Sequence, residues 1–409
     1  MAAEVSEAVP SGSTDIIIVG AGILGLAVAR ELHRRRPELS ISVLEKEDEV
    51  GAHQTSHNSG VVHAGIYYPP GSLKARLCVE GARELYAFCE EHDVAFERCG
   101  KLVIALEHGE RAGLDELDRR GRANSVPGLR RVDAAELREI EPHAAGIEAL
   151  HSPSTGIIDF PGVARALAYE LREAGIEVVT GCTVESAAPH AGRLRVVHGR
   201  GVTEAGFTVF CAGAWSDRLA VRAGAEPDPR IVPFRGAYLK LRPERRPLVR
   251  GLIYPVPDPS LPFLGVHLTR HISGEVLVGP TALLAPSRDA YRLTRIRPRD
   301  LTSTMTWPGT WRMARRWWRT GTTELRYAVS RRRFVREAAR YVPALQAADT
   351  EPAFAGVRAQ AVGRDGRLVD DFVFSRTERA VHVRNAPSPA ATSALAIARF
   401  VADEVAKRS

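Results

Sequence analysis

The glycine-rich turn Gly20–Gly25 constrains the fold of this chain more than any other feature. It follows Asp15–Val19, an apolar and β-branched run that predicts a short buried strand. A helical pattern over residues 23–36 comes next, and Pro37 closes it. A strand, a G-x-G-x-x-G turn and a helix in this order predict a Rossmann-like α/β domain that binds a dinucleotide.

A second strand is predicted at Ile41–Leu44, and it ends at Glu45, 20 positions after Gly25. This acid would accept hydrogen bonds from the adenosine ribose hydroxyls. Gly20 permits the tight turn, Gly22 lets the pyrophosphate approach the backbone, and Gly25 lets the helix lie close on the sheet. The positive end of the helix, at Ile23 and Leu24, then faces the phosphates. The alternative is a turn that serves packing only.

Two later segments favour FAD over NAD as the dinucleotide. A predicted helix at Phe160–Ala174 leads into the strand residues 175–184, and an apolar strand at Phe207–Cys211 breaks at Gly213 into a helix start. In a doubly wound sheet both segments would lie near the nucleotide. Each also fits a plain connection between a strand and a helix.

The bulk composition is that of an ordinary globular protein, with 44% apolar and 26% charged residues among 409. No run of about 18 apolar residues exists, so a membrane-spanning helix is not expected. Residues 1–14 predict a disordered tail without a secretory signal. The five cysteines have no C-x-x-C spacing, so we expect no metal site and no disulfide framework. A reducing cytoplasm is the simplest location.

The loop at residues 53–77 carries the densest group of chemically active side chains. It holds His53, His57, His63, two tyrosines and two basic residues, and it is too rich in Gly and Pro to form one helix or strand. Loops of this kind carry chemistry when a rigid scaffold positions them.

This loop and four other segments resemble the L-2-hydroxyglutarate oxidases and dehydrogenases, flavoenzymes of the D-amino-acid-oxidase and glycine-oxidase superfamily. The matches occur in the family's order over nearly the whole chain after Thr14. Near Thr281, Pro286 and Ser287 the chain departs from the family pattern, which leaves the substrate's size open. The matching segments are residues 53–68 with 71–75, 233–236, 253–259 with 262–270, 355–361 with 365–366, and 385–393.

The resemblance implies FAD-dependent oxidation of a 2-hydroxy acid, first of all L-2-hydroxyglutarate to 2-oxoglutarate. It implies a glycine-oxidase-like α/β fold with an interleaved α+β substrate domain. The alternatives are another hydroxy acid, an amino acid or a specialised-metabolite alcohol on the same scaffold, or a nucleotide-binding module without catalysis. We expect the FAD domain at residues 15–90, 150–230 and 350–407, and the substrate or cap domain at 91–149 and 231–349.

The expected cofactor contacts follow the fingerprint and the loop behind it. Chain direction leads from the ribose at Glu45 toward the flavin ring, which Ser56 to Gly60 would line. Pro389 suits the first turn of a helix predicted over 390–407, and Ser388 suits its cap. The full set is Gly20, Gly22, Ile23, Leu24, Gly25, Glu45, Lys46, Thr55, Ser56, His57, Asn58, Ser59, Gly60, Val184, Ala212, Gly213, Trp215, Arg358, Ser388, Pro389, Ala390, Ala391 and Thr392.

Oxidation of a hydroxy acid needs a base and a group that holds the carboxylate. His63 is the first candidate base, and His267, on a strand predicted at 263–268, is its rival. One alternative is that either histidine merely hydrogen-bonds a backbone group. Another is that His63 anchors the flavin covalently. Arg358 offers a planar fork for the carboxylate, although it could also be a packing arginine. Four candidates remain unranked for a second carboxylate, namely Tyr67, Lys74, Tyr254 and Arg270.

The segment Trp307–Arg340 combines four of the five tryptophans with ten arginines between 312 and 340. Within it, Met313–Arg319 predicts a basic amphipathic helix with aromatic anchors. Such a surface suits an anionic membrane interface, so a peripheral enzyme on the inner face of the cell membrane could reduce a quinone there instead of oxygen. The alternative is a cap-domain helix pair with Trp in the core and Arg in water. No nucleic-acid-binding motif accompanies the basic residues.

Overall fold

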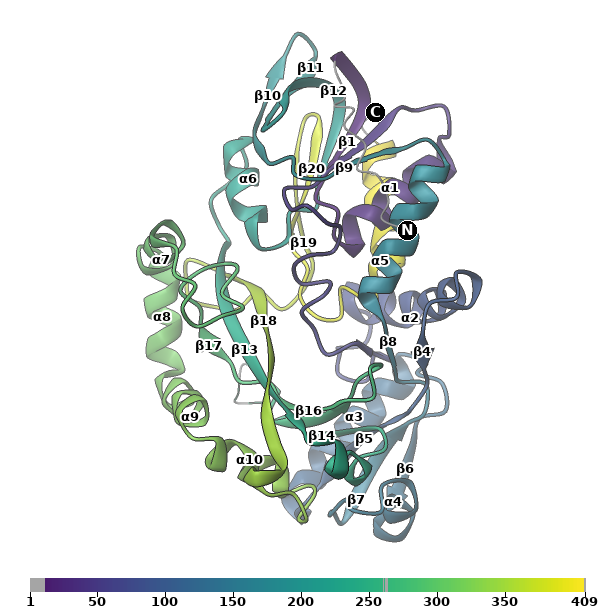
Figure 1. Ribbon diagram of the computed structural model, residues 1–409, viewed down its shortest axis with the longest axis vertical. Coiled ribbons are helices and arrows are strands. Elements are labelled where there is room, and N and C mark those ends of the chain that lie inside the picture. Colours follow the sequence, from purple (N-terminus) through teal and green to yellow (C-terminus); the bar gives the residue numbers. More distant parts are fainter. Residues whose placement is uncertain (1–11, 260, 262–263, 408–409) are drawn as a thin grey trace.

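The first sheet forms the upper part of the molecule in Figure 1. The computed structural model describes residues 12–259, 261 and 264–407. In this part of the chain, parallel pairing places β1 between β2 and β12, as the fingerprint predicts. Its strands are β1 (Gly12–Val19), β2 (Ile41–Leu44), β9 (Glu177–Val179), β10 (Val184–His190), β11 (Arg193–His198), β12 (Gly201–Phe210), β19 (Val373–Thr377) and β20 (Ala380–Asn385).

The first strand is longer than its apolar run predicts. It begins at Gly12, because residues 12–14 continue the parallel pairing with β12 at Thr203–Ala205. The disordered tail predicted for residues 1–14 is therefore wrong for 12–14, and residues 1–11 lie outside the described part. The second strand has the predicted bounds, and the helix that starts at Ile23 ends at Arg35, next to Pro37.

Helices cover both faces of the first sheet and bury its Ile, Val and Leu side chains. One face packs against α1 (Ile23–Arg35), α2 (Leu73–Glu91), α5 (Phe160–Glu173) and α11 (Ala394–Ala406), and the other against α6 (Ser216–Arg222). The predicted helix over 390–407 begins only at Ala394. Pro389 is therefore not in its first turn and Ser388 does not cap it, because residues 388–393 form turns that bring Ser388 to His63.

The second sheet forms the lower part of the molecule in Figure 1, with α3 (Arg111–Ala123), α4 (Ala134–Ile140) and α10 (Arg331–Ala339) against it. The predicted strand over 263–268 starts at His267 instead, and 264–266 are not strand. The strands are β5 (Lys101–Ala105), β6 (Arg130–Asp133), β7 (Glu148–Ser152), β13 (Arg230–Leu241), β14 (Leu252–Pro255), β15 (His267–Arg270), β16 (Val276–Gly279), β17 (Leu283–Leu284) and β18 (Thr350–Val362).

Strand β18 links the two parts of the molecule. It pairs with β13 along its length in the second sheet, and residues 373–385 then return to the first sheet as β19 and β20. The domain division that we propose from the sequence assigns residues 350–407 to the FAD domain. Strand β18 belongs to this segment of the chain but pairs within the second sheet. A small sheet of β3 (Val61–Val62), β4 (Phe96–Glu97) and β8 (Gly156–Ile158) lies between the two parts.

Three helices line one outer side of the molecule, on the left of Figure 1. They are α7 (Pro298–Met305), α8 (Pro308–Arg316) and α9 (Trp318–Val329). The single helix predicted over 313–319 is wrong, because the backbone leaves the helical conformation at Trp317, between α8 and α9. None of the helices described is long and apolar enough to cross a membrane.

Candidate active site

A cavity of about 1440 Å³ extends from the glycine-rich turn to residues of both sheets. Its lining comes mainly from residues 19–24, 44–46, 51–68, 182–184, 211–219, 295–300, 356–360 and 386–392.

The three fingerprint glycines have different surroundings at the start of α1. A Cβ on Gly20, where φ is +104°, would lie 2.5 Å from the Cys211 carbonyl oxygen, and one on Gly25 would lie 1.9 Å from that of Gly20. A Cβ on Gly22 would meet only the Thr55 hydroxyl, at 3.4 Å. The outer two glycines therefore let the turn close, and the middle one keeps space open toward the cavity.

Glu45 lies buried at the end of β2, where it holds the turn in place. Its Oε2 accepts a hydrogen bond from the Ala21 amide at 2.8 Å, and its Oε1 accepts one from the Glu47 amide at 3.0 Å. Thr55 acts from the other side, where its hydroxyl accepts a bond from the Ile23 amide at 3.1 Å. The acid lines the cavity and is already fixed by backbone donors.

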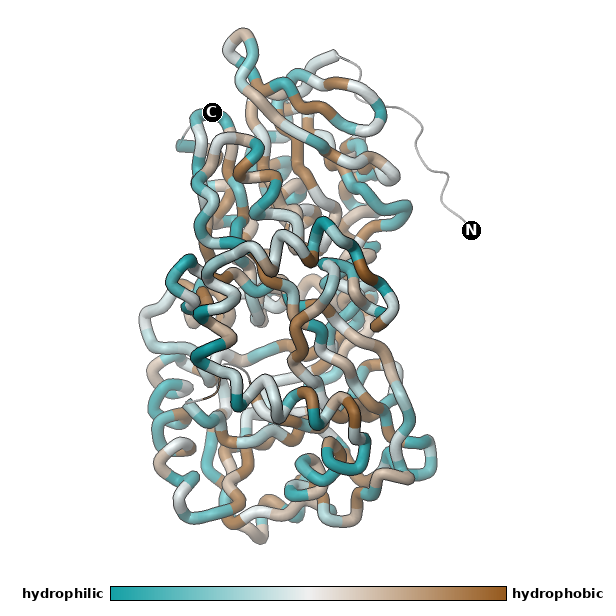
Figure 2. The backbone as a smooth tube through the Cα atoms, turned by 90° about the vertical axis from the view of Figure 1, so that its left-hand side faces the viewer, coloured by the Kyte–Doolittle hydropathy of each residue, from teal (hydrophilic) through white to brown (hydrophobic). Residues whose placement is uncertain are grey.

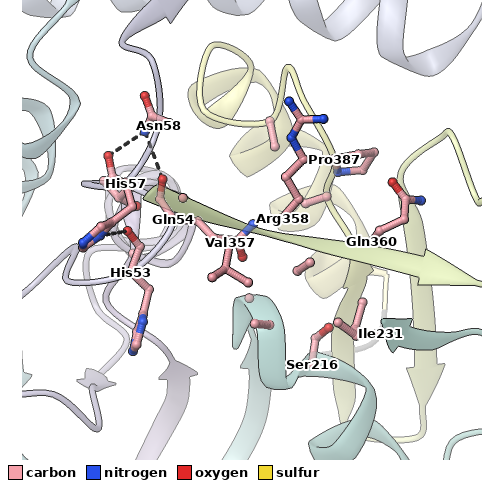
Figure 3. Close-up of a pocket in the computed structure, with 18 of the residues that line it drawn as sticks. His53, Gln54, His57, Asn58, Ser216, Ile231, Val357, Arg358, Gln360 and Pro387 are labelled. Atoms are coloured by element: carbon pink, nitrogen blue, oxygen red, sulfur yellow. Dashed lines mark hydrogen bonds between the residues drawn. The ribbon is translucent and has the colours of Figure 1, made fainter. Parts of the chain in front are cut away.

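The segment from His53 to Asn58 is folded on itself by the hydrogen bonds that Figure 3 shows, and Tyr291 packs against it. Asn58 Nδ2 donates to the Thr55 carbonyl at 2.7 Å, and His57 Nδ1 lies 3.0 Å from the His53 carbonyl. Tyr291 stacks on His57 at 3.8 Å between ring centroids, and its hydroxyl lies 2.9 Å from His53 Nδ1. A residue 238 positions away thus orders the start of the loop.

His63 lies in the cavity wall beside the turn that precedes α11. Its amide donates to the Thr392 hydroxyl at 3.1 Å, and its Nε2 lies 3.3 Å from Ser388 Oγ. Its Nδ1 is buried and has no protein hydrogen-bond partner. Burial and the nearby Lys101, His267 and Lys74 hold the pKa of His63 well below its ordinary value, so the imidazole is neutral near pH 7.

His267 lies in the same cavity, on β15, and stacks on Tyr254 at 4.1 Å between ring centroids. Its Nδ1 is 2.9 Å from the Gly265 carbonyl, which requires the proton on that nitrogen and leaves Nε2 as the acceptor. Burial lowers the pKa of His267 to about 3, with the charges of Arg358 and Lys101 acting in the same direction. The site thus contains two neutral histidines.

Arg358 enters the cavity from β18, next to Pro387 in Figure 3. The strand approaches the loop closely here, since a Cβ on Gly356 would lie 2.4 Å from the His57 carbonyl oxygen. The charge of Arg358 lowers the pKa of His267 and opposes the burial that raises the pKa of Tyr254 and of Tyr238. The positive charge of Arg358 therefore contributes to the electrostatic potential in the part of the cavity where His267 lies.

The remaining candidates for carboxylate binding divide into those in the cavity and one outside it. Lys74 lines the cavity and already holds a carboxylate, that of the exposed Asp370, at 2.9 Å. Tyr67 also lines the cavity, and its buried hydroxyl has no protein partner. Arg270 does not line it, because its guanidinium bonds Glu97 at 2.8 Å on the other side of β15.

Most of the site residues proposed from the sequence line this one cavity. Among the proposed cofactor contacts, Gly25, Ser56 and Gly60 do not. Gly25 packs on Gly20, and Ser56 donates to the Gly51 carbonyl at 2.8 Å. A Cβ on Gly60 would face Ile158 and His271 instead.

Sequence reasoning missed several residues of the site. Tyr68 lines the cavity, Tyr291 clamps the loop, and Lys101 lies buried behind Tyr67 and Tyr254. Tyr68 stands next to Tyr67 in the loop at residues 53–77, and the sequence could have suggested it as a candidate for substrate binding too. The others lie on strands or loops of the second part, where only tertiary contacts reveal their role.

The chain is similar to known proteins over nearly its whole length. A family model described as FAD dependent oxidoreductase matches residues 15–404. Human mitochondrial L-2-hydroxyglutarate dehydrogenase is 44% identical over 98% of this chain and 91% of its own length. L-2-hydroxyglutarate dehydrogenase from Indibacter alkaliphilus is 42% identical over 96% and 99%, respectively.

Solved structures share the fold at lower sequence identity. L-α-glycerophosphate oxidase from Mycoplasma pneumoniae, with FAD bound, has a TM-score of 0.79 at 22% identity and covers 96% of this chain and 95% of its own. Glycine oxidase from Geobacillus kaustophilus has a TM-score of 0.69 at 20% identity and covers 97% and 95%. The glycine-oxidase-like fold predicted from the sequence is confirmed.

Proposed function

The chain belongs to the FAD dependent oxidoreductase family and, within it, to the L-2-hydroxyglutarate dehydrogenases, and from this premise we propose that it oxidises L-2-hydroxyglutarate to 2-oxoglutarate. The observation that carries the proposal is the single cavity in which the dinucleotide turn, two neutral histidines and Arg358 come together. Full-length similarity supports the same substrate, since relatives at 42–45% identity carry this name.

Three independent features of the cavity fit FAD. Gly22 leaves room for a pyrophosphate against the start of α1, where helix amides and the helix dipole favour anions. Glu45 lies at the end of β2, at the distance along the chain that suits a ribose. The volume extends past the loop to the turn at 386–392, beyond what the adenosine half alone would need. These residues would hold the cofactor.

When bound, the flavin supplies the acceptor for the hydride that leaves the hydroxyl-bearing carbon. The protein must take the hydroxyl proton, and we assign this role to His63. Its Nδ1 is buried, neutral and without a protein partner, while Ser388 and Thr392 fix the ring and its backbone. His267, held by Gly265 with Nε2 as the acceptor, lines the same cavity and is suited to accept a hydrogen bond from the substrate.

A five-carbon diacid presents two carboxylates to this site. Arg358 is suited to the first, because its planar fork binds a carboxylate through two parallel hydrogen bonds. Lys74 and Tyr67 are suited to the second, since the lysine already holds a carboxylate and the tyrosine hydroxyl has no protein acceptor. The structure thus supports a site for dianions.

The positions at which the sequence departs from the family pattern support the family's substrate. Thr281 is buried, and its hydroxyl accepts a bond from the Ala237 amide at 3.0 Å. Ser287 Oγ donates to the Arg295 carbonyl at 3.0 Å. Neither these two residues nor Pro286 line the cavity. We therefore expect no change of substrate size from them.

Anaerobic addition of L-2-hydroxyglutarate to the FAD-loaded enzyme should bleach the flavin absorbance near about 450 nm. The D enantiomer should not, because the hydride must leave from the face of the carbon that the two carboxylate contacts select. Lactate, glutamate and simple alcohols test the alternative substrates in the same assay. Bleaching by the D enantiomer alone would refute L-2-hydroxyglutarate as the substrate. Bleaching by none of the compounds would refute the proposed oxidation.

The outer face of α7–α9 combines exposed apolar side chains with arginines. Trp311 and Trp318 are 56% and 60% exposed, whereas Trp307 is buried and Trp317 partly buried. The two inner tryptophans fit the alternative of a cap-domain core, and the two exposed ones are free to reach a membrane. Figure 2 looks onto this side and shows hydrophilic and hydrophobic residues alternating along it. The exposed apolar residues of these three helices are Leu301, Met305, Trp311, Trp318, Leu325 and Val329.

We propose that this face binds the anionic surface of a membrane, so that the enzyme is cytoplasmic and peripheral. Exposed arginines at 312, 315, 316 and 319 complement lipid phosphates, and tryptophans prefer the interfacial region. Arg316 and Trp317 also line the cavity, which brings the face close to the site. This placement favours a membrane quinone over oxygen as the electron acceptor.

The enzyme should sediment with vesicles that contain phosphatidylserine and should stay in solution with phosphatidylcholine alone. A variant with serine at Trp311, Trp318 and Val329 should lose this binding, because it lacks the apolar anchors. Tyr169→Ser is the matched control, since that tyrosine is 64% exposed on α5 and lies on another face. Equal sedimentation of wild type and the triple variant would refute the membrane face.

A further inference from the structure

Lys101 is one of the largest fully buried side chains of the protein, with 1% of its surface exposed. It begins β5, where it pairs with Leu252 of β14 and Ser152 of β7. Its Nζ lies 4.1 Å from the ring centroid of Tyr254 and 5.1 Å from that of Tyr67. Within the described residues no Asp or Glu forms an ion pair with it, so two aromatic faces support this ammonium.

A buried cation without a carboxylate partner is costly, and it persists where an anion compensates it. The tyrosines that hold Lys101 both line the cavity, whereas Lys101 itself lies one layer behind them. The Tyr67 hydroxyl is buried and has no protein acceptor. The charge and the free donor therefore point to an anionic ligand at this wall of the cavity.

We propose that Lys101 is a positioning residue for a dianionic substrate: its ammonium, held between Tyr67 and Tyr254, attracts the substrate's second carboxylate and strengthens the Tyr67 hydroxyl as a hydrogen-bond donor to it. The inference rests on the proposed function, because it assumes a diacid in this cavity. It assigns the second carboxylate to the Tyr67 side, with Lys74 as a further cation at the same end.

The ionisation of the surrounding groups makes the role of Lys101 measurable. Burial lowers the pKa of Lys101 to about 7, so its charge disappears as the pH rises through neutrality. Burial lowers the pKa of both histidines nearby and raises those of the tyrosines and cysteines nearby. Lys101 interacts electrostatically with His63, His267, Cys78 and Cys99, and its ammonium lies over Tyr67 and Tyr254. Lys74 and Arg358 act on the same histidines, Lys74 on His63 and Arg358 on His267.

The test is a titration of the oxidised holoenzyme with 2-oxoglutarate and with glutarate, followed by the change in flavin absorbance. The dissociation constant of wild type should rise about tenfold between pH 6 and pH 8, as the charged fraction of Lys101 falls. The Lys101→Met variant should bind both diacids about tenfold more weakly than wild type at pH 6, and its affinity should not change with pH. Lys101→Arg, which stays charged, should bind alike at both pH values.

Two further variants separate this role from a structural one. Lys240→Met removes a lysine from the same sheet that pairs with Glu275, and it should titrate like wild type. Tyr67→Phe should weaken diacid binding and keep the pH dependence. This variant tests whether the second carboxylate binds on the Tyr67 side of the cavity, even if Lys101→Met fails to bind FAD.

The outcomes distinguish this inference from the proposed function. An unchanged pH dependence in Lys101→Met, or a wild type that binds neither diacid, would overturn the role of Lys101. A wild type that binds glutarate with the expected pH dependence but is not bleached by L-2-hydroxyglutarate would overturn only the proposed function.

Discussion

Replacing Arg358 by alanine is expected to raise the apparent KM for L-2-hydroxyglutarate about 10²–10³-fold, which corresponds to the loss of a bidentate, charge-assisted contact in a buried site. FAD should stay bound, because the fingerprint turn and Glu45 lie at the other end of the cavity. Arg358→Lys should recover only part of the loss, since an ammonium cannot reproduce the planar fork. Steady-state kinetics with the flavin absorbance as a measure of loading check both.

The matched control for this prediction is Arg270→Ala. Arg270 is an arginine of the same sheet whose guanidinium bonds Glu97 outside the cavity, so its removal should leave KM within about twofold of wild type. If Arg358→Ala leaves KM unchanged, the substrate carboxylate is bound elsewhere. If Arg270→Ala raises KM as strongly, a general effect on the sheet explains both results.

His63→Asn should lower kcat about 10²–10⁴-fold at pH 7 with little effect on FAD content, because it removes the group that takes the hydroxyl proton. Asparagine keeps a polar side chain beside Ser388, so the local packing should persist. Rapid-reaction measurement of flavin reduction isolates this step from reoxidation. His267→Asn is the companion variant, and a larger loss in it would assign the base to His267.

The pH dependence provides an independent check on both histidines. Their pKa values are lowered by burial and by neighbouring positive charge, to about 3 for His267 and well below 6.5 for His63. A histidine acts as a base only above its pKa, where it is neutral. The rate of flavin reduction at saturating substrate should therefore stay constant as the pH falls through 6.5, and a loss centred near 6.5 would contradict either assignment.

The first two strands of the first sheet and the helix between them could be predicted closely, since their signals are local. The apolar run before Gly20, the turn itself and Pro37 mark β1 and α1, and the bounds of β2 agree. The errors arise where pairing or turns override the local pattern. Residues 12–14 become strand because β12 extends alongside them, and residues 390–393 stay out of α11.

The candidate site could be predicted in its composition but not in its arrangement. The loop at 53–77 and Arg358 stand out in the sequence, and both line the cavity. Arg270, a candidate for the second carboxylate, lies outside the cavity, because its guanidinium bonds Glu97. Lys101 carries no sequence signal, since an isolated lysine at the start of a strand is usually exposed.

The sequence by itself determines that this chain forms a dinucleotide-binding α/β domain, because glycines at fixed spacing and an acid at the end of the second strand act through short-range geometry. Only the tertiary structure decides which groups share a cavity. His63, His267, Tyr254, Arg358 and Lys101 come from segments separated by up to hundreds of residues. Their neutral or charged state results from burial beside one another, a property that exists only once the two sheets are assembled.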